Sequence, residues 1–173
     1  MLLIKYLLTA VLLVSPAIAA VDAQQIVSNN QAIARELDRA KGTIEKYDGG
    51  LISNLMVGKA LHDAKGIFGI ARKDLAGPDA YTDEESSKIM DSYKDLYPRV
   101  MDILDLAHDK ASECKKAGVQ YIAQGIFDHM HDEKKKLEDV MKSQLSDKHY
   151  RLVKPYSNKI DDAFRNAAKA YQN

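Results

Sequence analysis

Apolar side chains recur at intervals of three and four residues along most of the chain, the spacing that places them on one face of an α-helix. No segment shows the period-two alternation that is typical of a half-buried β-strand. The periodic segments are long and their connections are short, which favours antiparallel neighbours. The sequence therefore predicts an all-α fold, an antiparallel bundle of about five helices. The expected helices span residues 24–48, 51–76, 82–117, 119–145 and 147–171.

The second expected helix, 51–76, is apolar over much of its circumference. One stripe consists of Val57, Leu61, Ala64, Phe68, Ala71 and Leu75, and another of Ile52, Met56, Ala60, Ile67 and Ile70. A helix that is apolar on two sides is normally surrounded by other helices. We therefore expect residues 51–76 to form the inner helix of the bundle.

The same segment contains Gly58, Gly66 and Gly69. Each glycine costs roughly 1 kcal/mol relative to alanine in a helix interior, so another interaction must offset the loss. Gly58 and Gly69 lie on nearly the same line of the helix, because eleven residues are close to three full turns. Close contact between helices is the simpler explanation. The other is that the missing side chains leave room for an apolar guest along the bundle axis.

Capping signals mark several helix ends. Thr82 and Glu85 form a capping box, in which each side chain bonds to the backbone amide of the other residue. Gly49 or Gly50 is placed to cap the first helix, and Gly118 to end the third, because glycine adopts the left-handed conformation at no steric cost.

Two prolines lie inside expected helices, Pro98 in the third and Pro155 in the fifth. Proline lacks the amide hydrogen that the helical ladder needs. We therefore expect a kink or a split at Pro98, and an interruption in the first half of the last helix at Pro155.

Residues 1–19 have the features of a secretion signal. Lys5 precedes a short apolar run, 6–14, and Ala17-Ile18-Ala19 supplies the small residues of a cleavage site. The apolar run is shorter than the roughly 20 residues that a membrane-spanning helix requires. We expect cleavage near Ala19, a secreted product without a transmembrane segment, and a single helical-bundle domain over residues 20–173.

The charges are balanced, with 25 Lys and Arg against 25 Asp and Glu. This balance argues against a nucleic-acid partner, since such proteins usually carry a clear basic excess. Cys114 is the only cysteine, so no disulfide can form within the chain. Its position in line with Ala107 and Ala111 predicts a buried thiol.

The only cluster resembling a metal site is His129-Met130-His131-Asp132-Glu133. His129 and Glu133 are four residues apart and share a helix face, but two ligands do not make a zinc site. Together they interrupt the apolar line of the fourth helix, so either this side faces water or the pair lies at the mouth of an apolar cavity. No nucleophile or nucleotide-binding motif occurs. The sequence predicts no enzyme, no metal and no cofactor.

Several stretches together resemble the fungal hydrophobic surface-binding proteins, which are grouped with the cell wall galactomannoproteins. They are the secretion signal, the segment IEKYDGG at 44–50, then Val57, Ala60, Leu61 and Ala64, and finally Leu96, Val100, Leu104, Lys115 and Lys116 before Ala117-Gly118. The resemblance covers about Ile26 to Leu145. It implies a helical bundle without enzymatic activity and with affinity for apolar matter. Some members adsorb to hydrophobic surfaces and help to recruit secreted hydrolases, and others hold long-chain fatty acids in a central cavity.

We therefore predict a secreted protein that binds long-chain fatty acids or similar amphiphiles between its helices. The expected lipid-binding residues are Leu61, Phe68, Leu96, Val100, Leu104, Ile122, Ile126 and Met130, with His129 or a tyrosine hydroxyl donating to the carboxylate. The alternatives are an adhesive that coats hydrophobic surfaces and recruits a secreted hydrolase, and a secreted effector that binds another partner. Association with the cell wall is the alternative to release.

Overall fold

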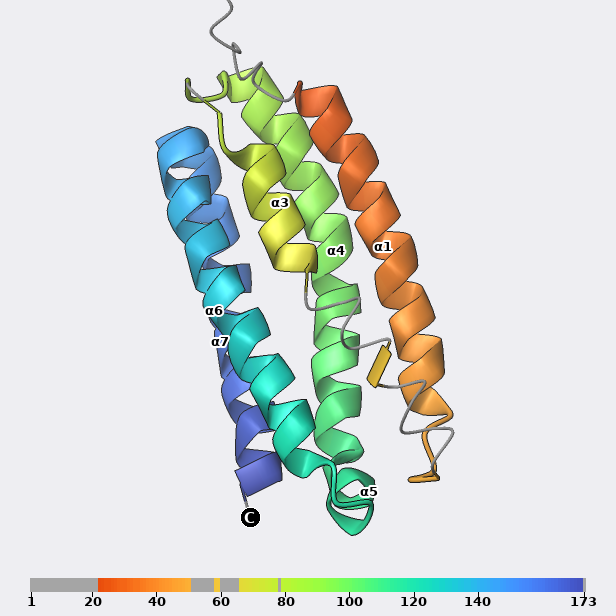
Figure 1. The fold of residues 1–173 in the computed structure, drawn as a ribbon. Helices are drawn as coiled ribbons and strands as arrows, with labels where there is room; N and C mark the ends of the chain where they lie inside the picture. The colour runs from red at the N-terminus through yellow and green to blue at the C-terminus, as the bar shows by residue number, and fades with distance from the viewer. Residues whose placement is uncertain (1–21, 51–57, 60–65, 78, 173) are drawn as a thin grey trace, which may run out of the picture.

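The computed structural model describes residues 22–50, 58–59, 66–77 and 79–172, and this part of the chain is helical with short connections (Figure 1). The helices are α1 (Ala23–Glu45), α3 (Ile67–Leu75), α4 (Asp83–Asp109), α5 (Ala111–Lys116), α6 (Gln120–Gln144) and α7 (Asp147–Gln172), and no strand occurs among the described residues. The all-α prediction is confirmed for this part. None of these helices is long and apolar enough to cross a membrane. The predicted signal segment, 1–19, lies outside the described residues.

The helices alternate in direction along the chain, as an antiparallel bundle requires (Figure 1). The helices α1, α4 and α7 therefore run in one direction, and α3 and α6 run in the other (Figure 1). Some helices of the same direction are direct neighbours, such as α1 and α4. Between α1 and α4, Arg99 Nε donates to Asp38 Oδ1 at 3.0 Å, and Lys41 Nζ donates to Asp102 Oδ2 at 2.7 Å. Both pairs are separated by 61 residues. A constant separation at successive contacts is the mark of parallel neighbours.

Five helices form a closed ring around the core. In order, α1 packs against α4, α4 against α7, α7 against α6, α6 against α3, and α3 against α1. Each contributes an apolar stripe to the space that the ring encloses. The largest fully buried hydrophobic side chains are Ile26, Leu75, Ile89, Ile103, Leu104, Phe127 and Phe164. The short α5 lies at one end and connects α4 to α6 (Figure 1).

The capping box at the start of α4 is confirmed. The Glu85 amide donates to Thr82 Oγ1 at 3.3 Å, and the Thr82 amide donates to Glu85 Oε2 at 2.9 Å. These bonds satisfy amides that have no partner within the helix.

Gly118 also ends its helix as predicted. Its φ of +72° is left-handed, and the amides of Gly118 and Val119 donate to the carbonyls of Lys115 and Cys114, each at 3.0 Å. This pair of bonds is the Schellman pattern, which satisfies the last carbonyls of a helix. The first helix, in contrast, ends at Glu45, three residues before the predicted boundary.

Neither proline divides its helix, since α4 runs through Pro98 and α7 through Pro155. Of the two alternatives predicted at Pro98, a kink or a split, the split does not occur, and the predicted interruption of the last helix at Pro155 is wrong. In the turn that contains Pro98, Arg99 Nη1 donates to the Asp95 carbonyl at 2.7 Å. The third predicted helix divides instead at Lys110, between α4 and α5.

The buried stripe of α6 differs from the predicted one. Ile122 is 63% exposed and Ile126 is only half-buried, so the prediction that Ile122 faces inward is wrong. Ala123 and Phe127, one position later, occupy the inner face. Both lines fit the helical period. The line that contains Phe127 faces inward, because burying an aromatic ring removes more apolar area from water than burying an isoleucine side chain.

Of the predicted inner helix, residues 51–57 and 60–65 lie outside the described residues, and α3 is its last part. Phe68, Ala71 and Leu75 are buried, as the first stripe requires, but Ile70 is 51% exposed. In the ring α3 has α1 on one side and α6 on the other. The prediction of a helix surrounded on all sides is therefore wrong for α3, which leaves one face in solvent.

Gly69 allows α3 to approach α6. A Cβ at this position would lie 3.3 Å from Glu133 Oε2, which is tighter than an ordinary contact. The close-contact explanation therefore fits Gly69. For Gly58, a Cβ would meet no described residue within 4 Å.

The lone cysteine is buried, as predicted. Cys114 lies on α5 and is buried. Its Sγ is 4.0 Å from the hydroxyl of Tyr171 on α7, and that hydroxyl donates to the Ala107 carbonyl at 2.8 Å. Burial raises the pKa of the Cys114 thiol. The thiol therefore behaves as a packing group rather than a nucleophile.

The capping box gives a direct test of helix initiation. Replacing Thr82 by alanine removes the acceptor for the Glu85 amide and should lower the free energy of unfolding by about 1 kcal/mol. Urea denaturation measures the change. Ser87→Ala, at an exposed position of the same helix, is the control and should change stability by less than about 0.5 kcal/mol. Equal losses in both variants would show that the cap does not stabilise α4.

Candidate functional site

An apolar cavity of about 80 Å³ lies inside the ring, and all five ring helices contribute to its wall. The apolar lining consists of Ile33 and Leu37 from α1, Ile67, Phe68 and Ala71 from α3, Met90, Leu96 and Val100 from α4, Leu137 and Met141 from α6, and Val153 and Ile160 from α7. No single helix forms this surface. Only the closed ring brings the five apolar stripes to one place.

Two tyrosines line the cavity between α4 and α7. The rings of Tyr97 and Tyr156 meet edge to face, with centroids 4.9 Å apart. Tyr156 is partly exposed, so this pair lies between the cavity and the solvent. Edge-to-face contact is a favoured arrangement of aromatic rings.

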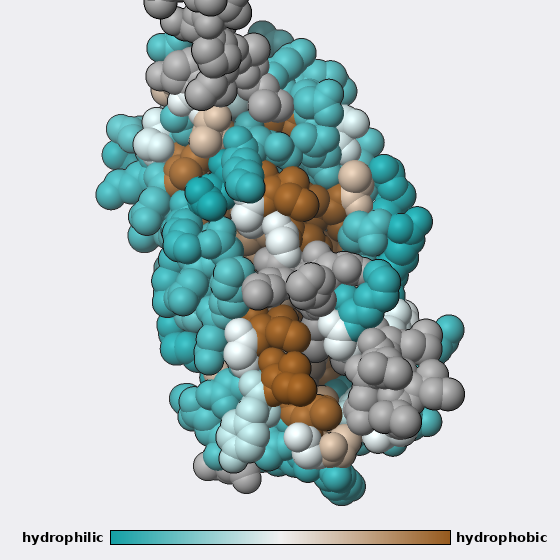
Figure 2. Space-filling view, in the orientation of Figure 1, coloured by the Kyte–Doolittle hydropathy of each residue, from teal (hydrophilic) through white to brown (hydrophobic). Residues whose placement is uncertain are grey.

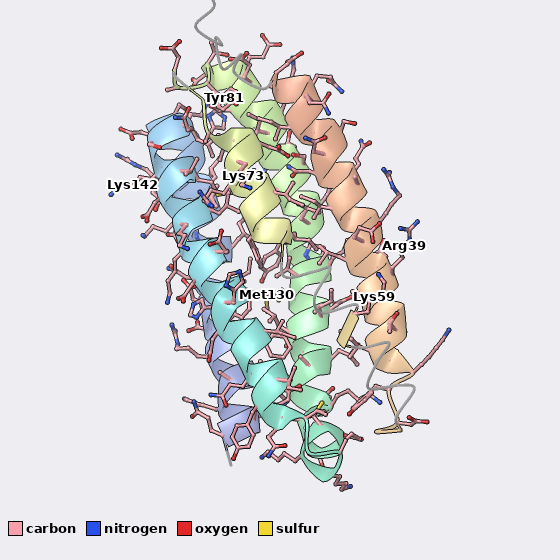
Figure 3. The ribbon with its side chains drawn as sticks, in the orientation of Figure 1. Arg39, Lys59, Lys73, Tyr81, Met130 and Lys142 are labelled. Atoms are coloured by element: carbon pink, nitrogen blue, oxygen red, sulfur yellow. The ribbon has the colours of Figure 1, made fainter. Side chains whose placement is uncertain are left out.

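The cavity brings together three of the predicted lipid-binding residues, Phe68, Leu96 and Val100. Leu104 and Met130 are buried in the core but are not part of the cavity wall. Figure 3 shows Met130 on the side of α6 that faces the bundle interior, whereas Arg39 and Lys142 point outward.

The remaining predicted residues lie elsewhere. Ile122 and His129 are exposed on α6, Ile126 is half-buried, and none of the three lines the cavity. Leu61 is outside the described residues. His129 is exposed, as the water-facing alternative for this side of α6 required, and the inner face of α6 carries Phe127 instead.

Glu133 also has a different role from the one predicted. Its Oε1 lies 2.6 Å from Lys136 Nζ, and its Oε2 lies 3.3 Å from Arg72 Nη2 on α3. These contacts hold the pKa of the Glu133 carboxyl below its usual value, with the Lys136 hydrogen bond as the largest cause. The described residues contain no group of three or more side chains placed to hold a metal ion. Glu133 therefore joins α6 to α3 as a structural ion pair.

A charged group that the sequence analysis missed lies on the cavity wall. Lys134 is only 4% exposed, and its Nζ is 2.9 Å from Glu138 Oε2 and 2.8 Å from Asp161 Oδ2. Glu138 Oε2 also accepts from Ser157 Oγ at 2.6 Å, and Oε1 accepts from the Tyr150 hydroxyl at 3.2 Å. Buried charges require such partners, because an unpaired ion loses its hydration. This network connects α6 to α7.

The far end of the network is aromatic. His131 Nε2 lies 2.9 Å from Asp161 Oδ1, and the His131 ring stacks on Phe164 with centroids 5.0 Å apart. Phe164 in turn contacts Phe68, a cavity residue, at a centroid distance of 6.1 Å. The polar network is therefore packed directly against the apolar centre.

The Glu138 carboxyl is held in its ionised form. Burial opposes ionisation, but hydrogen bonds from Ser157, Lys134 and Tyr150 outweigh it and keep the pKa of Glu138 below its usual value. Two carboxylates, Glu138 and Asp161, thus share one buried lysine.

One polar atom near the cavity is unsatisfied. The Tyr93 hydroxyl is buried and has no hydrogen-bond partner among the described residues, and Tyr93 lines the cavity. Burial raises the pKa of Tyr93 well above its usual value, so the phenol stays neutral. It can donate one hydrogen bond.

Helical spacing contained a signal for Lys134. Phe127, Met130, Lys134, Leu137 and Met141 follow the intervals of one helical stripe, and all five are buried. A lysine within an otherwise apolar stripe indicates a buried, paired charge. The choice of Ile122 and Ile126 as the inner line concealed this signal.

Comparison with known proteins identifies a sequence family and a fold. The sequence model of hydrophobic surface binding protein A matches residues 23–143. Three similar solved structures are AFMP4P in complex with palmitic acid, and ligand binding domains 1 and 2 of the Penicillium marneffei MP1 protein, both complexed with arachidonic acids. Their identities to this chain are 17%, 12% and 15%, and their TM-scores are 0.81, 0.76 and 0.77. The alignments cover 87% of this chain and 100%, 96% and 95% of those chains. No curated protein sequence matches this chain significantly. At these identities the structures establish a shared fold.

The buried lysine can be tested against its exposed neighbour. Lys134→Ala leaves the half-buried carboxylates of Glu138 and Asp161 without their shared cation, and the free energy of unfolding should fall by about 3 kcal/mol, the lower end of the loss for a buried pair. Lys135→Ala is the matched control, because Lys135 is exposed and pairs only with Asp132 at 3.5 Å. Urea denaturation should show a change below about 1 kcal/mol for the control. Similar losses for both lysines would contradict the assigned network.

The Glu138 hydrogen bonds predict a pH dependence of stability. Because the pKa of Glu138 is depressed in the folded protein, its contribution is complete above the unfolded value and is lost as the pH falls through the folded value. Ser157→Ala removes one donor, which should cost about 1.5–3 kcal/mol at pH 7 and less at pH values where the carboxyl is protonated. Melting temperatures from pH 7 down to 3 measure this. A loss that is independent of pH, or equal to that of the exposed control Ser143→Ala, would contradict it.

Proposed function

This chain belongs to the hydrophobic surface binding protein A family, and from that premise we propose that it is a secreted protein without enzymatic activity that binds long-chain fatty acids or similar amphiphiles between its helices. The observation that carries the proposal is the apolar cavity to which all five ring helices contribute. Phe68, Leu96 and Val100 are the residues of the predicted set that would contact the acyl chain. Proteins of the same fold with palmitic and arachidonic acids bound support this ligand class.

The chemistry of the cavity wall supports binding rather than catalysis. Its apolar residues offer an acyl chain about 0.8 kcal/mol for each methylene removed from water. Its charged residues are Lys94, Lys134 and Glu138. Lys134 pairs with both Glu138 and Asp161, and Lys94 pairs with Asp91. Charged side chains that already form ion pairs with each other hold helices together. They are not free to act as an acid or a base toward a substrate. The secretion part of the proposal rests on the signal features of residues 1–19.

The size of the cavity sets a condition on binding. Pockets that hold small molecules usually measure roughly 300–1,000 Å³, whereas this cavity measures about 80 Å³. A long acyl chain therefore fits only if the ring helices move apart. Binding then selects an expanded state, and the measured affinity is reduced by the free energy of opening.

Acyl-chain length tests the proposal. Each added methylene should raise affinity by about 0.8 kcal/mol, or roughly fourfold, until the expanded cavity is full. Saturated fatty acids of increasing length can be titrated against a displaceable fluorescent probe. Displacement that is absent or independent of chain length would contradict binding in the cavity. Native mass spectrometry of the purified protein gives a second measurement, through any fatty acid that copurifies.

A cavity-filling substitution separates binding from folding. Ala71→Leu adds bulk to the cavity wall, so affinity for palmitate should fall at least tenfold while the melting temperature is kept or raised. Ala168→Leu is the matched control, because Ala168 is a partly exposed position of α7 outside the cavity wall, and it should leave affinity within twofold. If Ala71→Leu binds palmitate as wild type does, the acyl chain lies elsewhere.

A second function is favoured by exposed apolar residues on α6. Tyr121 is 76% exposed and lies beside the exposed Ile122. Figure 2 shows hydrophobic residues gathered on this face of the molecule, over the first half of α6 and beside it. Such a patch would adsorb to a hydrophobic surface without opening the ring. An adhesive role, with recruitment of a secreted hydrolase, is therefore the alternative.

Hydrophobic beads test the adhesive role. Tyr121→Ser combined with Ile122→Ser should reduce coating of the beads severalfold while leaving fatty-acid displacement unchanged, because neither residue lines the cavity. Unchanged coating would exclude this patch as the adhesive surface.

A further inference from the structure

We propose that the anionic headgroup of the bound lipid is held outside the cavity, in a basic hollow between α4 and α7, and that the acyl chain reaches the cavity between Tyr97 and Tyr156. The proposal rests on the proposed function, since it requires an acyl chain in the cavity. It assigns a headgroup chemistry, a carboxylate or a phosphate, and a route of access.

The basic hollow is a surface depression of about 450 Å³ lined by Lys94, Arg151, Leu152, Pro155, Tyr156 and Lys159. Two of these residues, Lys94 and Tyr156, also line the apolar cavity. The hollow and the cavity therefore adjoin at these two side chains. A chain that passed Tyr156 would connect them.

The charges of the hollow favour an anion. Its lining contains three cationic residues and no acidic one. Arg151 and Lys159 form no ion pair with any described residue, and Lys94 shares its charge with Asp91 at 2.9 Å. Unpaired basic side chains at the edge of an apolar surface suit a carboxylate or phosphate, which can remain partly hydrated there.

The polar wall inside the cavity is a poor site for the same headgroup. Lys134 already faces two carboxylates, Glu138 and Asp161, so a lipid carboxylate beside it would be the third negative charge on one lysine. Tyr93 offers a single neutral donor, which cannot offset the cost of burying an ionised carboxylate. An anionic head is therefore more stable outside.

The route between Tyr97 and Tyr156 lies where both helices are weakened. Pro98 follows Tyr97 on α4, and Pro155 precedes Tyr156 on α7. Each proline removes one hydrogen bond from its helix, so small local movements there break fewer backbone bonds. On the outer side Leu152 is 50% exposed, which gives the first methylenes an apolar contact next to the cations.

Charge reversal at the hollow tests the headgroup site. Arg151→Glu combined with Lys159→Glu should weaken palmitate and hexadecyl phosphate binding at least tenfold, and should leave hexadecanol, which has no charge, within twofold. The larger loss for hexadecyl phosphate or for palmitate shows which headgroup the hollow prefers. Lys73→Glu combined with Lys142→Glu is the control with the same change of net charge, at exposed positions on α3 and α6 (Figure 3). Circular dichroism confirms that each variant is folded.

The outcomes separate this proposal from the proposed function. If wild type binds neither palmitate nor hexadecanol, the cavity does not hold acyl chains and the proposed function is wrong. If wild type binds both, and charge reversal at the hollow weakens neither anion, the headgroup site is wrong while the function stands. Loss of palmitate affinity in Tyr93→Phe, with none on charge reversal, would place the headgroup inside the cavity.

Release kinetics test the route. Tyr156→Ala opens the space between hollow and cavity, so the rate at which palmitate dissociates should rise at least fivefold. Tyr121→Ala removes an exposed tyrosine on α6 and is the matched control, with an unchanged rate. Equal dissociation rates in Tyr156→Ala and wild type would overturn the proposed route.

Discussion

The structure depends on a ring of five amphipathic helices, each of which has essentially one apolar face to bury. A helix at the centre would need to be apolar all round, and α3 is not, because it carries Arg72, Lys73 and Asp74. The helices therefore pack side by side around a common axis and point their apolar stripes toward it. Neighbouring helix axes are usually about 8–10 Å apart, and side chains must fill the space that the ring encloses. A small residual cavity at the axis follows from this geometry.

The charged network on α6 and α7 makes the ring specific. Apolar residues in place of Lys134, Glu138 and Asp161 together would avoid the desolvation of three charges. The pairing of Lys134 with Glu138 and Asp161, however, is satisfied in only one rotation of α6 against α7. We infer that the network fixes the face of α6 that turns inward, together with the burial of Phe127. The exposure of Ile122 is a consequence of that rotation.

The same arrangement relates stability to binding. A fully packed core would resist an acyl chain, whereas a ring with an unfilled axis has an apolar surface that gains contacts when a chain enters. The cost is the separation of helices that pack against each other in the ring. Between α4 and α7 the lining of the cavity includes a pair of tyrosines, Tyr97 and Tyr156, with proline beside each. The charged network instead holds α6 to α7, so these two helices are expected to move together.

Local sequence determined much of this protein. Helical periodicity, the capping box at Thr82, the left-handed end at Gly118 and the buried Cys114 are all set by interactions between residues close in the chain or by simple burial. Phe68, Leu96 and Val100 were also identifiable as core-facing cavity residues. Tertiary structure alone decided the rest. Periodicity permits two inner lines on α6 that differ by one residue, and only packing against α7 selects Phe127 and Lys134 over Ile122. Long-range contacts decide which helices are neighbours, because the apolar face of an amphipathic helix can pack against many different partners. The contact between Tyr97 and Tyr156, 59 positions apart in the sequence, is therefore set by the tertiary structure.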